Sequence, residues 1–528
     1  MIRSLLLVMV CCSICVAYRD WIEEPGPRVK ATQGEVWPKP QQQRSTNEVM
    51  NEGTACKDLD EMLVRYKGIM LRTLPMTSRH CNGNRKLCPG RRRSSRSYLN
   101  SLRINLEGPC DLPLDSNMNE TYSLTISPVQ GESVLHSQTY WGIIRGLETF
   151  SQLLYADPVE HVLLLNKTTI YDYPRFSHRG ILLDTSRHFI PLQKIMQLLD
   201  AMSYNKMNVF HWHIVDDQSF PYESYTFPEL SQMGSYHSSM VYTQQDIARV
   251  IEYAGKLGIR VMPEFDSPGH TRSWGVAHPE ILTPCYTNGQ LDGTLGPIDP
   301  TLNETYEFME KLLQEIIQVF PDKYLHLGGD EVGFSCWQNN PHLNERMRAM
   351  GIPNLTKLEE VYIQKLVDMT TKFNASALVW QEVFDNGVLL PSDTIVHIWT
   401  GDHQAKLQQV TSAGLPALLS TCWYLDHLAT GGDWLKFYKC DPWDFPSDSR
   451  QRDLVLGGEA CMWSEVVDAN NVLQRVWPRA SAVAEKLWSK MNADNTSYAA
   501  RRLEEHSCRM NRRGIPAQPP NGPGFCLT

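Results

Sequence analysis

The chain has 528 residues, which is more than one ordinary domain, and 42% of them are hydrophobic, enough for a sizeable core. This composition excludes a mainly disordered protein. The formal net charge of −9 and the pI near 6.0 give no reason to expect nucleic acid as a partner.

The first residues predict a signal peptide over residues 1–17. One Arg precedes the apolar run LLLVMVCCSICV, and small residues at Val16-Ala17 suit cleavage. The run is about 12 residues long, too short to cross a bilayer, and no later run approaches about 18 uninterrupted apolar residues. We therefore expect a mature chain that does not span a membrane.

Cysteines and sequons agree with the secretory route. Three of the 14 cysteines lie in the predicted signal peptide, so the remaining eleven leave at least one thiol unpaired within the chain. No CxxC or Cys/His spacing suggests zinc, and we expect neither a metal nor a cofactor. The six N-x-[ST] sequons are predicted glycosylation sites: Asn119, Asn166, Asn303, Asn354, Asn374 and Asn495.

Residues 18–173 predict a small α+β domain. Two strands, Tyr122–Ile126 and Glu132–His136, form a predicted hairpin around Gly131. The segment Thr139–Leu154 has apolar residues on one helical face, and Val162–Leu165 returns to strand. Strands followed by a packed helix are typical of this class.

The pattern changes after Pro174, and residues 174–528 predict a (β/α)8 barrel with C-terminal helices. Short apolar runs recur, most of them followed by a helical segment, as in parallel sheets that are buried on both faces. About a dozen residues join the fifth and sixth runs, too few for a full helix, and a doubly wound open sheet remains the alternative. Eight strands in series favour closure. The eight runs are Ile181–Asp184, Met207–Trp212, Ile259–Asp266, Tyr324–Asp330, Ala377–Gln381, Ile395–Trp399, Ala417–Ser420 and Leu454–Glu459.

Polar and aromatic residues gather at the ends of these runs, where the active site of such a barrel lies. Carboxylates, an Arg and several indoles at one mouth indicate a sugar site, because pyranose rings stack on aromatic rings. We interpret His211 and His213 as hydrogen-bonded barrel histidines rather than metal ligands, since no third ligand has metal spacing. The residues at the strand ends include Arg187, Asp216, His270, Trp380, Trp399, Trp463 and Glu465.

The adjacent pair Asp330-Glu331 indicates an unusual glycosidase mechanism. Most glycosidases hold two carboxyl groups roughly 5–5.5 Å or 6.5–9.5 Å apart, on opposite sides of the bond that breaks. Adjacent residues are poorly placed for that, but one can protonate the leaving oxygen while the other orients a group beside it. This arrangement suits a substrate whose 2-acetamido group is the nucleophile. GGDE is also compatible with an ordinary strand-to-helix turn.

The chain resembles glycoside hydrolase family 20, in particular the animal lysosomal β-hexosaminidase α and β subunits, from about Cys56 to Cys526. The motifs that carry the resemblance are HRGILLDTSRH (178–188), NVFHWHIVDDQSFPYES (208–224), EFDSPGH (264–270), YLHLGGDEV (324–332), WQEVFDN (380–386) and GGEACMWSE (457–465). The implied fold is a small α/β domain followed by the barrel, and the implied activity is that of a retaining β-N-acetylhexosaminidase.

The resemblance implies a role for each matching residue. Glu331 would be the general acid and then the general base, while Asp330 would orient the acetamido group with help from the Tyr424 hydroxyl. His270 would lie beside Glu331 and support its protonation. Arg187, Asp216 and Glu465 would bind ring hydroxyls, and the pocket walls would be Trp380, Trp399 and Trp463.

The same resemblance implies three disulfides, Cys56–Cys110, Cys285–Cys336 and Cys508–Cys526. Cys81 and Cys88 lie close enough in sequence to pair, and the states of Cys422, Cys440 and Cys461 stay open.

Two positions bear on specificity. Asp426-His427 follows Trp423-Tyr424-Leu425, where the α subunit has an Asn-Arg pair that favours sulfated substrates and the β subunit has Asp-Leu. Asp426 makes this chain closer to β and predicts a preference for neutral substrates. Thr430 replaces a Tyr that, in the animal subunits, reaches the partner's active site.

The function we expect is removal of terminal non-reducing N-acetylglucosamine or N-acetylgalactosamine from glycolipids, glycoproteins or glycosaminoglycans through an oxazolinium intermediate. The alternative is a non-catalytic hexosaminidase-like sugar-binding protein, against which intact Asp330, Glu331 and Tyr424 argue. A chitin-degrading barrel glycosidase is a closer rival. We further expect a homo- or heterodimer with a related subunit, located in the lysosome, with secretion as the alternative.

Overall fold

The computed structural model describes residues 29–46, 57–72, 99, 101–110, 113–127, 132–157, 162–427, 431–490 and 495–526. The predicted signal peptide, Cys56, Cys81 with Cys88, the hairpin turn at Gly131, and Thr430 lie outside these residues, and what was predicted for them stays a prediction. None of the helices in the described part of the chain is long and apolar enough to cross a membrane.

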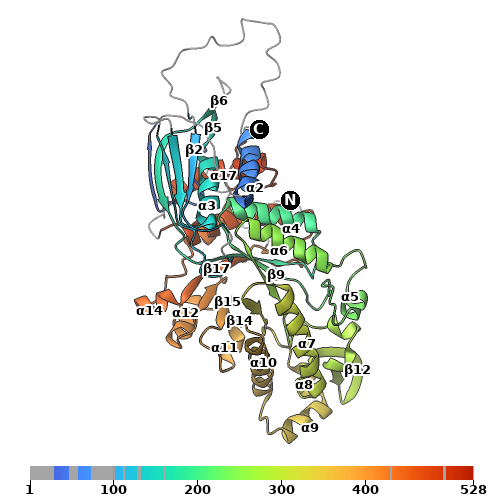
Figure 1. The fold of residues 1–528 in the computed structure, drawn as a ribbon. Coiled ribbons are helices and arrows are strands. Elements are labelled where there is room, and N and C mark those ends of the chain that lie inside the picture. The colour runs from blue at the N-terminus through green and yellow to red at the C-terminus, as the bar shows by residue number, and fades with distance from the viewer. Residues whose placement is uncertain are drawn as a thin grey trace, which may run out of the picture.

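The N-terminal part holds a five-stranded sheet, which forms one end of the molecule in Figure 1. The predicted pair of strands around 122–136 is confirmed, with Leu124 opposite Leu135 in an antiparallel ladder. A second, two-stranded hairpin of β5 (Tyr155–Asp157) and β6 (Val162–Leu164) follows. In sheet order the five strands are β1 (Gln42–Thr46), β7 (Lys167–Asp172), β3 (Tyr122–Ile126), β4 (Glu132–Ser137) and β2 (Ser101–Leu106).

Helix α3 (Tyr140–Leu153) packs on this sheet and confirms the helix predicted there. The Thr139 side chain caps its first turn by accepting a backbone N–H. All of its residues are buried, not only one face. The C-terminal helix α17 (Thr496–Arg512) lies beside it (Figure 1), and Arg513 after that helix reaches Glu148 of α3 at 2.7 Å. The C-terminal end of the chain therefore contributes to the core of the N-terminal part.

The eight predicted runs form a closed barrel of parallel strands, which excludes the doubly wound open sheet. The barrel closes where the last strand pairs with the first, with Met462 opposite Leu183. In chain order the strands are β8 (His178–Asp184), β9 (Val209–His213), β10 (Arg260–Glu264), β13 (Tyr324–His326), β14 (Ser376–Trp380), β15 (Ile395–Ile398), β16 (Ala417–Leu419) and β17 (Val455–Met462).

Helices on the outside connect these strands. The predicted capping box is confirmed: Thr243 and Asp246 bond reciprocally at the start of α6. Only α11, a five-residue helix, lies between β14 and β15, which explains the short spacing seen in the sequence. The helices are α2 (Lys57–Leu71), α4 (Leu192–Tyr204), α5 (Glu229–Gly234), α6 (Gln244–Lys256), α7 (Asn303–Val319), α8 (Ser335–Asn339), α9 (Pro341–Ala349), α10 (Leu355–Lys372), α11 (Gln381–Asp385), α12 (His403–Ser412), α13 (Trp434–Lys439), α14 (Ser449–Asp453), α15 (Val472–Val476) and α16 (Arg479–Trp488).

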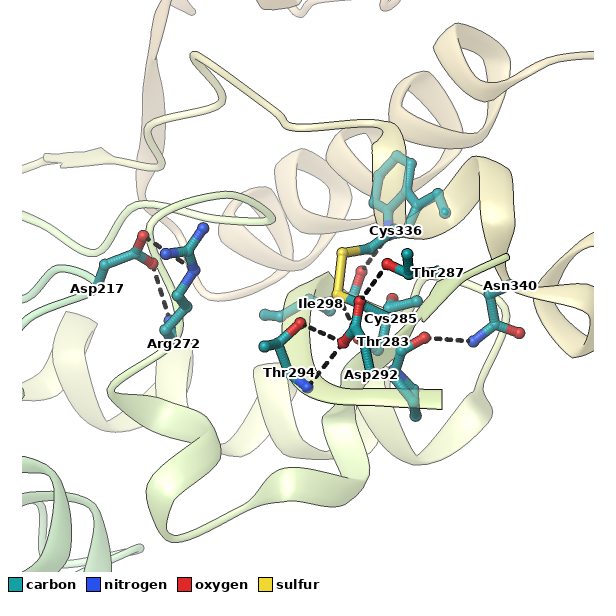
Figure 2. The surroundings of a disulfide bond; sticks show 12 residues. Asp217, Arg272, Thr283, Cys285, Thr287, Asp292, Thr294, Ile298, Cys336 and Asn340 are labelled. Carbon is teal, nitrogen blue, oxygen red and sulfur yellow. Dashed lines mark hydrogen bonds and ion pairs between the residues drawn. A yellow bond between two sulfur atoms is a disulfide. The ribbon is translucent and has the colours of Figure 1, made fainter. Parts of the chain in front are cut away.

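Disulfides join segments of the barrel. Figure 2 shows the bond between Cys285 of the hairpin β11–β12 (Leu282–Thr287 and Gln290–Ile298) and Cys336 of α8. This bond ties the hairpin to the segment that follows Glu331.

Two of the three implied disulfide pairs are present, Cys285–Cys336 and Cys508–Cys526. Cys110 is also disulfide-bonded, and its implied partner lies outside the described residues. Cys422 pairs with Cys440, which the sequence left open. Cys461 is a buried free thiol.

The predicted glycosylation sites lie mostly on the surface. Five of the asparagines are exposed, and only Asn166 is half-buried, with its side-chain oxygen accepting the Tyr155 hydroxyl at 3.0 Å. Asn354 and Asn495 also cap helices α10 and α17 with their side chains. Glycosylation at these positions stays a prediction.

Candidate active site

A cavity opens at the carboxyl ends of the barrel strands, where the sequence placed the site. With the open space at its mouth included, its empty volume is about 550 Å³. Its lining comes from seven of the eight strand ends and the loops after them. The lining residues are Arg187, His213, Asp266, His270, Asp330, Glu331, Trp399, Tyr424, Asp426, His427, Trp463 and Glu465.

The loop after β13 brings the two predicted catalytic carboxyls to the cavity. Gly328 and Gly329 have φ of 72° and 93°, a region that favours glycine. A side chain at Gly328 would overlap Asp266, because its Cβ would lie 1.6 Å from the Asp266 carboxylate. Glu331 itself has φ of 50°. This backbone turns two successive acids toward one space instead of opposite sides.

Asp330 is buried and only partly satisfied. Its Oδ1 has no hydrogen-bond partner, and a buried carboxylate oxygen without a partner carries a desolvation cost of about 1–3 kcal/mol. Burial raises the pKa of Asp330, while the nearby His270 lowers it. Asp266 lies against Asp330, and burial together with that acidic neighbour holds the pKa of Asp266 well above its usual range. A protonated Asp266 can therefore donate to an ionised Asp330.

Glu331 stands at the mouth, with 59% of its side chain exposed. Its Oε2 lies 3.7 Å from Nε2 of His270, a residue that also has a positive φ of 56°. Burial would lower the pKa of His270, but the hydrogen bond to Asp216 and the charge of Asp330 raise it to about 9. The acid thus faces an imidazolium at neutral and acidic pH.

Asp216 does not line the cavity, although the resemblance gives it a substrate contact. It is fully buried, and its carboxylate is held by Arg187 at 2.8 Å, His213 at 2.8 Å and His270 at 3.2 Å. Burial would raise its pKa, but His213 and His270 bring the pKa of Asp216 far below its usual range. Asp216 therefore contacts three residues that line the cavity, and its predicted substrate contact stays a prediction.

The barrel interior beneath the cavity holds an alternating line of acids and imidazoles. His213 Nδ1 lies 2.7 Å from Glu264, whose carboxylate lies 3.0 Å from His211. His211 Nδ1 is 2.7 Å from Glu459, and Glu459 reaches His178 at 2.6 Å. Burial opposes the charge on these imidazoles, but the carboxylates raise the pKa of His211 to about 9 and of His213 to about 10.

These partners agree with the interpretation of His211 and His213 as hydrogen-bonded barrel histidines. Two further histidines, which the sequence did not indicate, lie beside them. His326 and His397 each have a ring nitrogen within 4.8 Å of a ring nitrogen of His211. His326 Nδ1 accepts the backbone N–H of Gly328 at 3.1 Å, so its neutral form carries the proton on Nε2. That tautomer disfavours a metal at Nε2.

The tryptophans divide into two groups. Trp399 and Trp463 line the cavity, with Tyr424 near Trp399 at a ring-centroid distance of 6.2 Å. Trp380, predicted as a third wall, is 1% exposed and lies beneath the lining, where its indole N–H donates to Glu264 at 2.8 Å. Its position on the inward face at the end of β14 places it one layer below.

The remaining predicted residues lie on the rim. Arg187 bridges Asp184 at 3.0 Å and Glu465 at 3.6 Å, and Glu465 is 56% exposed. Asp426 is partly buried, 3.8 Å from His427. Burial raises the pKa of Asp426. A cation and two acids therefore ring the opening.

Three lining residues, His213, Asp266 and His427, were absent from the predicted catalytic and substrate-binding residues, and His427 was considered only as the neighbour of Asp426. The signal for the other two was available in the sequence. Both belong to quoted motifs, and their position directly at the ends of β9 and β10 was the available signal.

Residues 176–491 match the family model described as "Glycosyl hydrolase family 20, catalytic domain". The chain belongs to glycosyl hydrolase family 20. Residues 24–153 match a second model, described as "beta-acetyl hexosaminidase like". The family 20 match and the curated relatives make the chain a glycoside hydrolase, a β-hexosaminidase.

This family 20 chain is similar to β-hexosaminidase subunit alpha of Bos taurus, 48% identical over 478 residues that cover 89% of this chain and 88% of that protein. It is 51% identical to β-hexosaminidase subunit beta of Homo sapiens over 426 residues, 80% of this chain and 76% of that one. The structure of the Flavobacterium johnsoniae chitobiase matches with a TM-score of 0.76 at 28% identity, covering 91% of this chain and 73% of that chain. A Vibrio harveyi exo-β-N-acetylglucosaminidase, with a TM-score of 0.76 at 22% identity, supports the fold alone.

Proposed function

We propose that this enzyme removes terminal non-reducing N-acetylglucosamine or N-acetylgalactosamine from glycoconjugates, with retention of configuration, by substrate-assisted catalysis. The observation that carries the proposal is the geometry of Asp330 and Glu331. One acid is exposed at the mouth, and the other is buried with a carboxylate oxygen that lacks a partner. An acetamido N–H supplies that partner, and a plain hexose does not.

In the first step Glu331 donates its proton to the glycosidic oxygen while the acetamido carbonyl oxygen attacks C1 of the same sugar. The C1–O bond breaks, the aglycon leaves as an alcohol, and a cyclic oxazolinium forms. In the second step the Glu331 carboxylate accepts a proton from water as that water attacks C1. The oxazolinium ring opens, and Glu331 is again an acid.

The groups around Asp330 fit the charge that this path develops. An ionised Asp330 accepts the acetamido N–H and steadies the positive charge, while the Tyr424 hydroxyl donates to the acetamido carbonyl. Protonated Asp266 keeps the negative charge on Asp330, since two adjacent buried carboxylates resist ionising together. His270 lies between Asp216 and Glu331, so its imidazolium interacts electrostatically with both carboxyl groups and helps to keep Glu331 in place.

The pocket walls and rim supply recognition. The indoles of Trp399 and Trp463 offer stacking faces for the sugar ring and the acetamido methyl. Arg187 and Glu465 face the cavity with donors and acceptors for ring hydroxyls. We infer, as the sequence predicted, that the enzyme is lysosomal or secreted and that it forms a homo- or heterodimer with a related subunit.

The test is hydrolysis by the purified chain of a chromogenic N-acetylglucosaminide, compared with Glu331→Gln. General acid catalysis contributes about 10²–10⁴-fold, so Glu331→Gln lowers kcat by at least about 10²-fold while substrate still binds. The 2-hydroxy sugar analogue, which lacks the acetamido group, is the matched substrate control and is not turned over. A wild-type chain that binds the sugar without hydrolysing it would instead identify a non-catalytic sugar-binding protein.

A further inference from the structure

The indole of Trp399 is held from behind by the short helix α11. Its N–H lies 2.9 Å and 3.1 Å from the two carboxyl oxygens of Glu382. The neighbouring Gln381 accepts the backbone N–H groups of Trp399 and Thr400 at 3.1 Å and 3.2 Å. Two successive residues after β14 therefore fix Trp399, the residue that follows β15 and forms part of the cavity wall.

Glu382 is partly buried and its surroundings are acidic. The charges that act on it are Asp330 from the catalytic loop and Asp385 from its own helix, and Glu382 acts in turn on the buried Glu359 of α10. Lys406 of α12, a cation at this end of α11, pairs with Asp385 at 2.5 Å instead. Within the part of the chain that the structure describes, the carboxyl of Glu382 thus has the indole N–H as its partner and no ion pair.

We propose that Glu382 is a positioning residue for catalysis: it fixes the indole plane of Trp399 against the bound acetamido sugar. The inference rests on the proposed function, because Trp399 matters only if the sugar occupies the cavity beside Asp330. Glu382 does not line the cavity itself, so it acts through Trp399 and contributes no substrate contact.

The form in which Glu382 acts follows from its neighbours. Burial, together with the charge of Asp330, raises the pKa of Glu382 to about 7 although the indole N–H of Trp399 acts to lower it. Below that pH the group is a neutral acid that still accepts the indole N–H through its carbonyl oxygen. The neutral form adds no second negative charge beside Asp330, which suits an enzyme that works in an acidic compartment.

The experiment compares Glu382→Gln and Glu382→Ala with Asp385→Ala, a control on the same helix whose side chain does not contact Trp399. The amide of Gln keeps an acceptor for the indole and matches the neutral acid in shape. We expect Glu382→Gln to keep kcat/KM within about twofold of wild type at pH 5, and Glu382→Ala to lose about tenfold, the loss that one hydrogen bond of about 1.4 kcal/mol would give. Asp385→Ala stays at the wild-type value.

A double-mutant cycle with Trp399→Phe separates positioning from general damage to the fold. Phe keeps a flat aromatic face but has no N–H for Glu382 to accept. In that background Glu382→Ala costs less than about twofold, because the interaction is already absent. A tenfold loss in both backgrounds, or full activity of Glu382→Ala in the wild-type background, overturns the proposal.

The pH profile gives a second readout that a structural role does not move. Glu382→Gln follows wild type below pH 6 and departs from it above pH 7, because only the wild-type residue ionises there. Identical profiles over the whole range would remove the neutral-acid part of the proposal. Failure of the proposed function is distinct, since the wild-type enzyme itself would then not turn over the substrate.

Discussion

Two regions of this barrel bury carboxyl groups, and the pKa of those groups is shifted in opposite directions in the two regions. In the interior, Glu264 and Glu459 lie between histidines; burial would raise their pKa, but those imidazoles hold the pKa of both well below the usual range. Beside the cavity, no cation among the described residues pairs with Glu359 or Glu382, and burial raises the pKa of each to about 7. The same residue type is an anion in one place and an acid in the other.

The two regions differ in what their carboxyl groups do: the paired acids give rigidity, and the unpaired acids respond to pH. A paired network is rigid, because each group satisfies the next and removal of one leaves an uncompensated charge. It holds Asp216, His270 and Arg187 in fixed positions at the cavity. The unpaired acids lie near Asp330, where a protein needs groups whose protonation follows the pH of the compartment.

The largest expected effect comes from breaking the paired region. Glu264→Gln leaves His211 and His213 without their shared carboxylate, and the loss of one partner of a buried pair costs about 3–5 kcal/mol. The thermal unfolding midpoint should fall by roughly 5 °C. Glu359→Gln at pH 5 is the control, because it replaces a neutral acid with an amide of similar shape. An equal fall in both variants would contradict the distinction between the regions.

The next effect falls on activity rather than stability. Asp330→Asn removes the anion that balances the cationic intermediate, and loss of one such electrostatic group costs about 10²–10³-fold in kcat. A cyclic thiazoline analogue of the intermediate should also bind the variant more weakly than it binds wild type. Kinetics within tenfold of wild type, or an analogue that does not compete with substrate, would count against the assisted mechanism.

A smaller effect should appear only as pH changes. The folded state raises the pKa of Glu359 to about 7, above the unfolded value of about 4.3. Its contribution to stability is therefore fully present below about pH 4.3 and is lost as pH rises through about 7. Glu359→Gln lacks this loss, so its unfolding free energy relative to wild type should rise by about 1–3 kcal/mol between pH 4.5 and 7.5. Chemical denaturation at both pH values measures this, and a constant difference would contradict it.

The smallest effect concerns the rim. An ionised Asp426 repels a 6-sulfate by about 1 kcal/mol at about 4 Å in water, which is about fivefold in kcat/KM. Burial raises the pKa of Asp426, so the preference for neutral over sulfated substrate should weaken on going from pH 6.5 to pH 4.5. A kcat/KM on the sulfated sugar equal to or higher than that on the neutral sugar at both pH values would overturn the predicted preference for neutral substrates. The Asp426→Asn variant should abolish the pH dependence of that preference.

The sequence by itself determined the eight strands, because a strand buried on both faces has a continuous apolar run, whereas closure into a barrel was decided by the pairing of β17 with β8. It also predicted the adjacent acids after β13 as a candidate site, since they follow directly on two glycines. The capping box of α6 and the short β14–β15 link were equally local. These features depend on backbone conformation and on residues close in the chain.

Only the tertiary structure decided which residues face the cavity and which lie beneath it. Trp380 and Trp399 end neighbouring strands, yet one is 1% exposed and the other is a wall. Asp216 and Asp266 have the same side chain, and contact with His213 and His270 in one case and with Asp330 in the other makes them an anion and an acid. Depth in the barrel and the charge of neighbours arise from strands far apart in sequence, so no local pattern can encode them.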